Sequence, residues 1–118
     1  MTRLPAIEVA LIDDAKLTDY LFNHAHPSGG PKARFLERFG FAGERLEELR
    51  RALLLQAQGN AISASRKTDF GTIFEIEGAL PSPDGRNPFV RTVWMIDDDA
   101  TAPRLITMVP MRRPRKRR

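Results

Sequence analysis

The spacing of hydrophobic residues along the chain changes from a helical to a strand period near residue 60. The clearest helical segment spans residues 44–58, where apolar residues recur every three or four positions: Leu46, Leu49, Ala52, Leu53 and Ala57. Beyond residue 60, apolar and polar residues alternate, with Phe74 and Ile76 on one side of a strand and Glu75 and Glu77 on the other. The pattern therefore predicts helices followed by strands.

Two shorter helices are predicted ahead of the long one. The first begins after Asp13 as its N-cap and ends near Asn23, and the second has Pro31 in its first turn and Gly40 at its end. The predicted strands are 62–68, 72–80, 89–96 and 104–109, and residues 7–12 form either a short strand or an extended lead-in. This order predicts an α+β fold with N-terminal helices packed on one face of a four-stranded antiparallel meander.

The length of 118 residues predicts one domain. The charge distribution separates a weakly acidic body from a basic C-terminal end. Residues 112–118 contribute six of the 19 lysines and arginines, so residues 1–111 carry 13 against 15 acidic residues, a net −2. We therefore expect a single domain over 1–111 and a basic, disordered tail over 112–118. Such a tail either binds nucleic acid or an acidic partner, or only solubilises the end of the chain.

Several classes of function are excluded by what the sequence lacks. Cysteine is absent, which excludes disulfides, thiolate metal sites and cysteine catalysis. No apolar run approaches the roughly 20 residues of a membrane helix, and Pro5 and Glu8 interrupt the first apolar stretch, so neither a membrane span nor a signal peptide is expected. The glycine motifs of nucleotide-binding loops and nucleophile elbows are also missing. We expect a cytoplasmic protein without a cofactor.

The loop before the second helix holds the first candidate chemistry. His26 can exchange a proton near neutral pH, and Lys32 and Arg34 lie in the first turn of a helix whose amides favour anions. Together they suit a phosphate-containing ligand. Alternatively, His24 and His26 are surface loop residues. Two histidines two positions apart without a nearby carboxylate are a poor ligand set, so no metal site is predicted.

The strand 89–96 and the last strand hold a second set of candidates. Arg91 can reach a phosphate from a sheet face, or it can pair with Glu75 or Glu77 on the neighbouring strand. Trp94 is either a core residue or a platform for base stacking. Thr107 can offer a hydroxyl to a ligand or reflect strand propensity alone.

The sequence resembles the domain of unknown function 6883 family. The resemblance is carried by Lys16-Leu17-Thr18-Asp19-Tyr20-Leu21, His26-Pro27-Ser28-Gly29, Lys32-Ala33, Phe39-Gly40-Phe41, Gly71, Gly78, Pro83-Asp84-Gly85-Arg86, Arg91-Thr92-Val93-Trp94, Pro103-Arg104-Leu105-Ile106-Thr107 and Pro110. The resemblance covers nearly all of residues 14–110 and does not include the basic tail. Because the function of that family is unknown, membership implies no particular activity.

The predicted layout is also similar to that of small toxin ribonucleases of the barnase, EndoU, colicin and RelE-like group. That likeness implies RNA cleavage without a metal, in which the 2′-hydroxyl attacks the adjacent phosphate. By role, it implies His26 as general acid or base, Lys32 and Arg91 as phosphate-binding groups, and Thr92 or Thr107 as a positioning hydroxyl.

The leading hypothesis is therefore a cytoplasmic, metal-independent endoribonuclease of toxin type with an antitoxin or immunity protein as partner. The residues expected to contact RNA around the site are Arg34, Trp94, Arg112, Arg113, Arg115, Lys116 and Arg117. One alternative is a non-catalytic module that binds a protein partner. Another is a nucleic-acid-binding accessory protein that uses only the tail.

Overall fold

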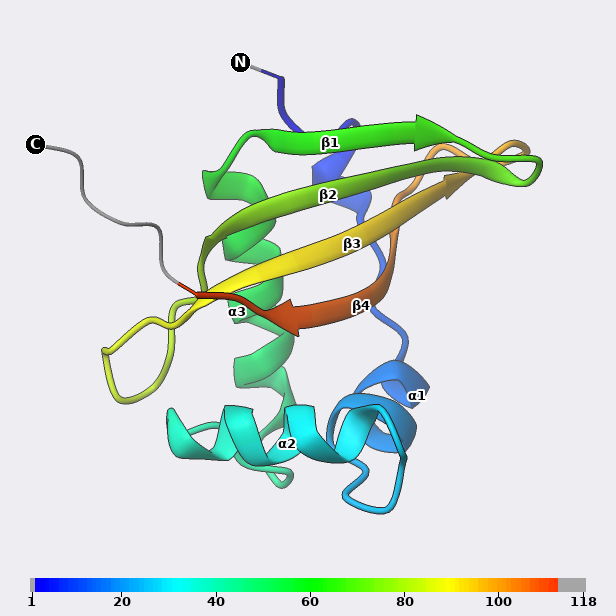
Figure 1. The fold of residues 1–118 in the computed structure, drawn as a ribbon. Helices are drawn as coiled ribbons and strands as arrows, with labels where there is room; N and C mark the ends of the chain where they lie inside the picture. Colours follow the sequence, from blue (N-terminus) through cyan, green and yellow to red (C-terminus); the bar gives the residue numbers. More distant parts are fainter. Residues whose placement is uncertain (1, 113–118) are drawn as a thin grey trace, which may run out of the picture.

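The computed structural model describes residues 2–112, which form short helices followed by a sheet (Figure 1). The elements in chain order are the 3-10 turn η1 (Ile7–Val9), α1 (Asp14–Lys16), the π-helical turn η2 (Leu17–Leu21), α2 (Gly29–Arg38), α3 (Leu46–Gly59), β1 (Ile62–Lys67), β2 (Gly71–Ala79), β3 (Phe89–Asp97) and β4 (Arg104–Pro110). The strands pair antiparallel in the order β1-β2-β3-β4. The predicted α+β meander is confirmed.

The N-terminal segment differs from the predicted strand or extended lead-in. Residues 7–9 form a 3-10 turn, and only Leu11 then pairs with the sheet, through a parallel bridge to Arg104. Two backbone hydrogen bonds make this bridge, from Leu11 N to Pro103 O at 2.8 Å and from Leu105 N to Leu11 O at 3.0 Å. The segment therefore contacts the β4 end of the sheet without adding a strand to it.

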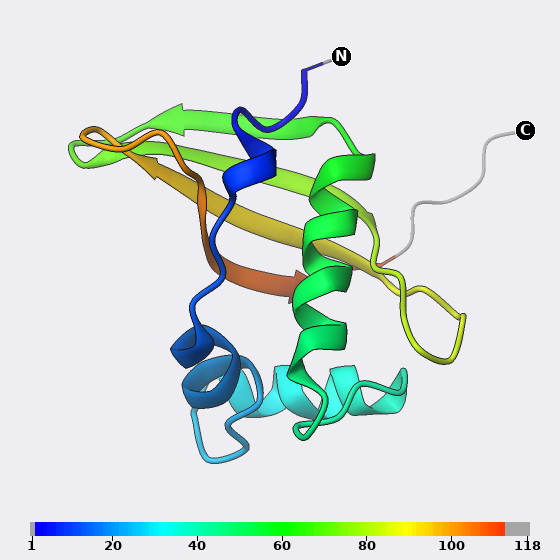
Figure 2. The same ribbon diagram turned by 180° about the vertical axis from the view of Figure 1, so that it is seen from behind.

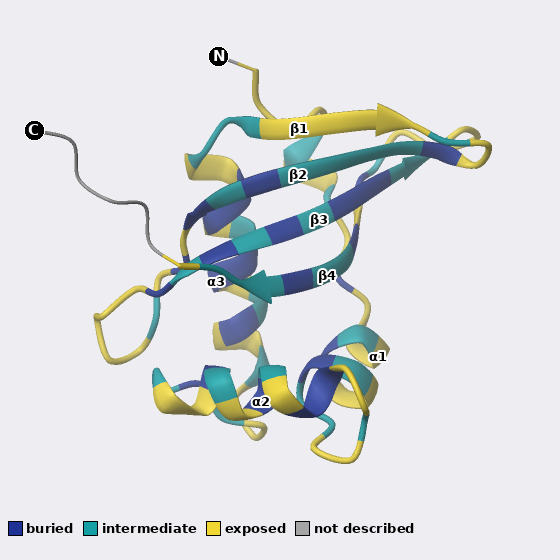
Figure 3. Cartoon of the chain, viewed as in Figure 1, coloured by how far each residue is buried: buried dark blue, intermediate teal, exposed yellow. Residues whose placement is uncertain are grey.

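Helix α3 covers one face of the sheet, as Figure 2 shows from behind. Its predicted apolar stripe is buried, with Leu49, Leu53 and Ala57 fully inaccessible to solvent. Burying an aliphatic side chain of this size contributes roughly 1.5–3 kcal/mol. The core on the sheet side consists of Ile76, Leu80, Val90, Trp94, Leu105 and Met108. Figure 3 shows the corresponding alternation along β2 and β3, whereas β1 is mostly exposed.

The other face of the sheet, turned toward the viewer in Figure 1, carries no helix within the described residues. Cross-strand partners in an antiparallel sheet have their side chains on the same face. The register therefore places one set of side chains on this surface, here called the open face: Ile73, Glu75, Glu77, Arg91, Val93, Met95, Thr107 and Val109. Apart from Met95, which is buried, the side chains of the open face are partly exposed and accessible to a ligand.

The first helix is shorter than predicted, because α1 gives way to the π-helical turn η2. The hydrogen bond from Phe22 N to Leu17 O, 2.8 Å long, closes this wider turn. Leu17 and Leu21 from η2 are fully buried in the core. Segments α1, η2 and α2 lie together beside β4, below the sheet in Figure 1. No helix among residues 2–112 is both long and apolar enough to cross a membrane.

Candidate functional site

Three side chains from three different elements meet beside β4. Lys32 Nζ, from the first turn of α2, donates hydrogen bonds to Tyr20 Oη at 2.5 Å and to Thr107 Oγ1 at 2.7 Å. The two hydroxyls of Tyr20 and Thr107 are themselves 2.8 Å apart. Lysine has three N–H donors, so one is left without a partner among residues 2–112 and can bind a ligand. The group formed by Lys32, Tyr20 and Thr107 is here called the edge cluster.

Positive charge surrounds the phenol of the edge cluster. Lys32 Nζ and Lys16 Nζ lie 4.9 and 5.1 Å from the centre of the Tyr20 ring. Burial alone would raise the pKa of Tyr20, but the hydrogen bonds from Lys32 and Thr107, with the charges of both lysines, outweigh it and lower that pKa below its usual value. Tyr20 is therefore more easily ionised than a free tyrosine.

Arg91 lies on the open face, diagonally across the β3–β4 pair from Thr107. Arg91 is paired with Val109 and Val93 with Thr107, so Arg91 and Thr107 are diagonal neighbours, about 7–8 Å apart. A side chain of arginine can cross that distance. The edge cluster and Arg91 therefore share one surface.

Two carboxylates from β2 flank Arg91, in agreement with the alternative that this residue pairs with Glu75 or Glu77. Arg91 Nη2 lies 2.7 Å from Glu77 Oε2, and its Nε lies 3.6 Å from Glu75 Oε1. The hydrogen bond to Glu77 raises the pKa of Arg91, so the guanidinium remains charged. Its Nη1 group has no partner among residues 2–112 and can bind a ligand.

His26 lies against the edge cluster, with its ring 4.9 Å from that of Tyr20 in an edge-to-face arrangement. Its Nδ1 accepts the backbone N–H groups of Ser28 and Gly29, both at 3.0 Å. A neutral imidazole with an accepting Nδ1 carries its proton on Nε2. His26 thus closes the turn before α2 and leaves only an N–H donor for a ligand. His24 is separate, with Nε2 2.9 Å from Glu37 Oε2.

The glycine pair before Pro31 explains how α2 approaches the π turn so closely. A Cβ on Gly29 would lie 1.7 Å from the carbonyl oxygen of Tyr20, and one on Gly30 would lie 2.5 Å from that of His24. Neither position tolerates a side chain without a shift of the backbone. The absence of side chains at Gly29 and Gly30 therefore allows α2 to pack closely enough to place Lys32 beside Tyr20.

Thr92 and Trp94 are buried, and their predicted roles in catalysis and RNA contact are wrong for this structure. Both are fully inaccessible to solvent, on the face covered by α3. Trp94 Nε1 donates to Thr92 Oγ1, which in turn donates to Gln56 Oε1, each at 2.8 Å. Gln56 Nε2 also donates to the carbonyl oxygens of Ile76 and Val90. This is a hydrogen-bond network in the core, and a ligand on the surface cannot reach it.

Two of the remaining residues predicted to contact RNA, Arg34 and Arg112, lie within the described part of the chain. Arg34 is exposed on α2 and forms no ion pair within the described part of the chain. Arg112 is exposed two residues after β4. Arg113, Arg115, Lys116 and Arg117 lie outside the described residues.

Tyr20 and Lys16 were not among the candidate site residues predicted from the sequence, in which they appeared only as part of a family motif. The available signal was their spacing of four residues, which places them on the same side of a helical turn. Tyr20 is also the single tyrosine of the chain. Its partner Thr107 is 87 positions away, so the contact itself was not predictable from local pattern.

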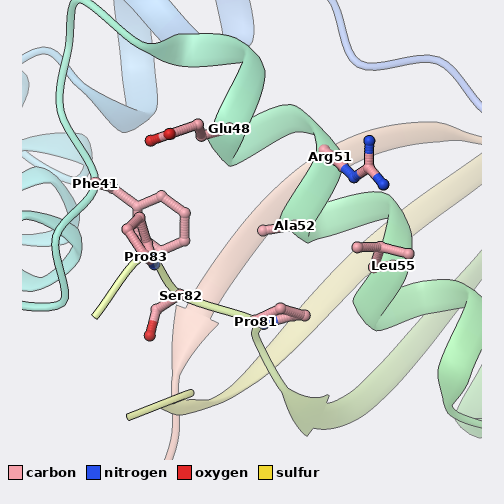
Figure 4. A pocket seen from close by; sticks show the side chains of 8 residues that line it. All are labelled: Phe41, Glu48, Arg51, Ala52, Leu55, Pro81, Ser82 and Pro83. Carbon is pink, nitrogen blue, oxygen red and sulfur yellow. The ribbon is translucent and has the colours of Figure 1, made fainter. Parts of the chain in front are cut away.

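Two hollows differ in their relation to the edge cluster. One, of about 250 Å³, opens between α1 and the start of β4 and is lined by Leu11, Asp13, Ala15, Lys16, Tyr20, Arg104 and Leu105. The other, shown in Figure 4, lies between α3 and Pro81–Pro83 and is mainly apolar, with Phe41 and Leu55 in its wall. Only the first hollow contains a residue of the edge cluster. In residues 2–112, no group of three or more His, Asp or Glu side chains is arranged to hold a metal ion.

The fold and the edge cluster define a small α+β domain with a cationic, hydroxyl-rich site at one side of its sheet. The family model described as Domain of unknown function (DUF6883) matches residues 3–112. The chain belongs to this family, which confirms the resemblance seen in its motifs.

A solved structure shares the fold. One chain of a contact-dependent growth inhibition toxin–immunity protein complex from Klebsiella pneumoniae 342 has a TM-score of 0.64 and 20% sequence identity, over 86% of this chain and 100% of that chain. At this identity the likeness shows a common fold alone. No curated protein matches this sequence.

Proposed function

We propose that this chain is a small metal-independent endoribonuclease of toxin type that acts in the cytoplasm and is held by an antitoxin or immunity protein. The reaction is attack of a 2′-hydroxyl on the adjacent phosphate, which leaves a 2′,3′-cyclic phosphate and a 5′-hydroxyl. The observation that carries the proposal is the position of Lys32 and Arg91 on one surface, with Thr107 between them.

Lys32 and Arg91 supply the electrostatic part of this reaction. The phosphate gains negative charge in the transition state, and fixed cations at that position stabilise it. Each residue keeps an N–H group for a phosphate oxygen, as described above. The hydroxyl of Thr107, held 2.7 Å from Lys32 Nζ, is placed to orient the phosphate between the two cations.

In this proposal His26 acts only as a hydrogen-bond donor, and it is not the general base. Its Nδ1 lone pair accepts the two backbone N–H groups at the start of α2. Its Nε2 therefore contributes a hydrogen bond to a phosphate oxygen or to the leaving oxygen. Proton removal from the 2′-hydroxyl falls to another group.

The proposal is tested by incubating purified protein with labelled RNA in EDTA and analysing the ends of the products. We expect cleavage that EDTA does not prevent, with 2′,3′-cyclic phosphate and 5′-hydroxyl ends. Products with 3′-hydroxyl and 5′-phosphate ends would contradict the proposed chemistry. No cleavage of several RNAs by a folded protein would contradict the nuclease assignment.

The second candidate is a non-catalytic module that binds a protein partner. It is favoured by the fold neighbour, which is one chain of a complex between a toxin and an immunity protein. In this case the open face is a docking surface, and Arg91, Glu75 and Glu77 pair with charges of the partner. Copurification from a native host does not by itself separate the two candidates, because the proposed toxin also has a partner. A module of this kind copurifies with its partner, retains it when Lys32 is replaced by Met, and cleaves no RNA when it is freed of that partner.

A further inference from the structure

The cleavage proposed above requires a group that accepts the proton of the 2′-hydroxyl. We propose that Tyr20, as its phenolate, is this general base, held in place by Lys32 and Thr107. The inference rests on the proposed ribonuclease function, and it adds a residue that no sequence motif assigned to chemistry.

The position of Tyr20 is the first argument. Its hydroxyl lies 2.5 Å from Lys32 Nζ and 2.8 Å from Thr107 Oγ1, the two groups proposed to bind and orient the phosphate. A 2′-hydroxyl adjacent to a phosphate bound there comes within hydrogen-bond reach of the phenol. Tyr20 is carried by η2, and π-helical turns are rare and often occur at functional sites.

The hollow beside Tyr20 is the second argument. Its volume is about 250 Å³, below the 300–1,000 Å³ range that is typical of whole-ligand pockets. It therefore suits one sugar–phosphate unit of a longer chain that continues across the open face. Lys16, Arg104 and Asp13 line this hollow together with Tyr20. Because Arg104 is paired with Asp97, the positive charge that the wall offers to a polyanion is that of Lys16.

The charged groups around the phenol favour its ionised form. Lys16 from α1 and Lys32 from α2 lie over the ring. Arg104 from β4 shares the hollow but is paired with Asp97, and the neutral ring of His26 contacts the edge of the phenol ring. Among residues 2–112, the carboxylate that lines the hollow is that of Asp13. The balance is cationic, consistent with the lowered pKa of Tyr20.

The proposed step balances without a metal or cofactor. The Tyr20 phenolate takes the proton of the 2′-hydroxyl while the 2′-oxygen bonds to phosphorus and the bond from phosphorus to the 5′-oxygen breaks. The leaving 5′-oxygen takes a proton from water. Tyr20 then returns its proton to solvent.

Glu77 is the rival for the same role, because it is a carboxylate on the open face. Both Nε and Nη2 of Arg91 bind its Oε2, at 3.2 and 2.7 Å. It is thus committed to an ion pair, whereas the Tyr20 hydroxyl is held by the groups proposed to bind substrate. The variant Glu77→Gln separates the two assignments.

A titration of the free protein tests the ionisation of Tyr20 without RNA. The chain has one tyrosine, so the ultraviolet absorbance of phenolate reports Tyr20 alone. We expect a midpoint below the value of about 10 for free tyrosine, and a shift upward in Lys32→Met. The control Arg38→Met removes a cation at the far end of α2 and should shift it much less. A midpoint at or above that of free tyrosine, or one unaffected by Lys32→Met, would overturn the inference.

The kinetic test uses single-turnover cleavage of RNA by Tyr20→Phe, which keeps the ring. We expect a loss of rate on the order of 10²-fold or more, together with loss of the rise in rate with pH that follows the phenol titration. A folded Tyr20→Phe variant with the parental rate and pH profile would overturn the base assignment but leave the ribonuclease standing. Loss of activity in Glu77→Gln but not in Tyr20→Phe would also overturn the base assignment and leave the ribonuclease standing. If the parent cleaves no RNA, the ribonuclease and the role of Tyr20 both fail.

Discussion

Lys32 Nζ and Thr107 Oγ1 lie 2.7 Å apart although 75 positions separate them in the chain. The contact joins the first turn of α2 to the last strand and brings a lysine onto the open face of the sheet. Tyr20 shares both partners, and Arg91 lies diagonally across from Thr107. This arrangement supports a phosphate-binding site more strongly than any single residue does.

The hydroxyl of Thr107 is expected to matter for function more than for stability. Thr107→Val keeps the shape of the side chain but removes the partner of Lys32 and Tyr20. We expect RNA cleavage to fall by about tenfold or more, while the free energy of unfolding changes by about 1 kcal/mol or less, because the site is partly solvated. Single-turnover rates and urea unfolding measure the two effects. The exposed Thr101 gives a control, Thr101→Val, and equal activity in the two variants would contradict the role of Thr107.

Thr92 should show the opposite behaviour. Thr92→Val leaves the buried Trp94 N–H and the Gln56 carbonyl without their partner, which costs about 1–3 kcal/mol. We expect a lower midpoint of urea unfolding and a normal cleavage rate under conditions where the variant remains folded. A variant of parental stability that no longer cleaves RNA would show that Thr92 belongs to the site after all.

The close packing of the glycine pair predicts a large effect from a small substitution. In Gly29→Ala, the new methyl group would lie 1.7 Å from the carbonyl oxygen of Tyr20, so α2 must move away from η2. We expect this variant to lose both stability and the low pKa of Tyr20. The matched control is Gly43→Ala, whose new methyl would meet nothing within 4 Å. Similar unfolding curves and tyrosine titrations for both variants would contradict this account.

Stability should fall in acid in a way that depends on two carboxylates. The hydrogen bond from Arg104 lowers the pKa of Asp97, and the backbone N–H of Arg86 is the main cause of the lowered pKa of Asp84. A lowered folded-state pKa stabilises the protein above the unfolded value of about 3.9, and this contribution is lost as pH falls through the folded-state value.

The double variant Asp84→Asn, Asp97→Asn tests this dependence. It should be less stable than the parent at neutral pH, and the difference should shrink below about pH 4, when the parental carboxylates are also protonated. Both side chains are partly exposed, so the effect should be small. Urea unfolding at several pH values measures it, and a difference that grows in acid would contradict the assignment.

The sequence predicted much of the fold because strand and helix periods are local properties. The two faces of β2 and β3 follow from alternation, and with them the pairing of Arg91 with Glu77. The stripe of α3 follows in the same way from its 3.6-residue period. These features depend on neighbours a few positions apart or on adjacent strands.

The edge cluster was predicted only in part, because it depends on long-range packing. Lys32 and Thr107 were candidates, but nothing in the sequence showed that they meet. The π turn that presents Tyr20 also buries Leu17 and Leu21 in the core, and such packing is not readable from local pattern. Thr92 was misassigned because a hydroxyl on a strand looks the same in sequence whether it faces a ligand or a buried glutamine.

The central claim is that Lys32 is part of an RNA-cleaving site, and a comparison of two lysine variants tests it most directly. Lys32→Met and Lys67→Met each remove one positive charge, but Lys67 lies at the end of β1 and pairs with Asp98. With RNA in EDTA, we predict cleavage by the parent and by Lys67→Met, and a loss on the order of 10²-fold in folded Lys32→Met. Equal cleavage by the two variants, or none by the parent, would contradict the account.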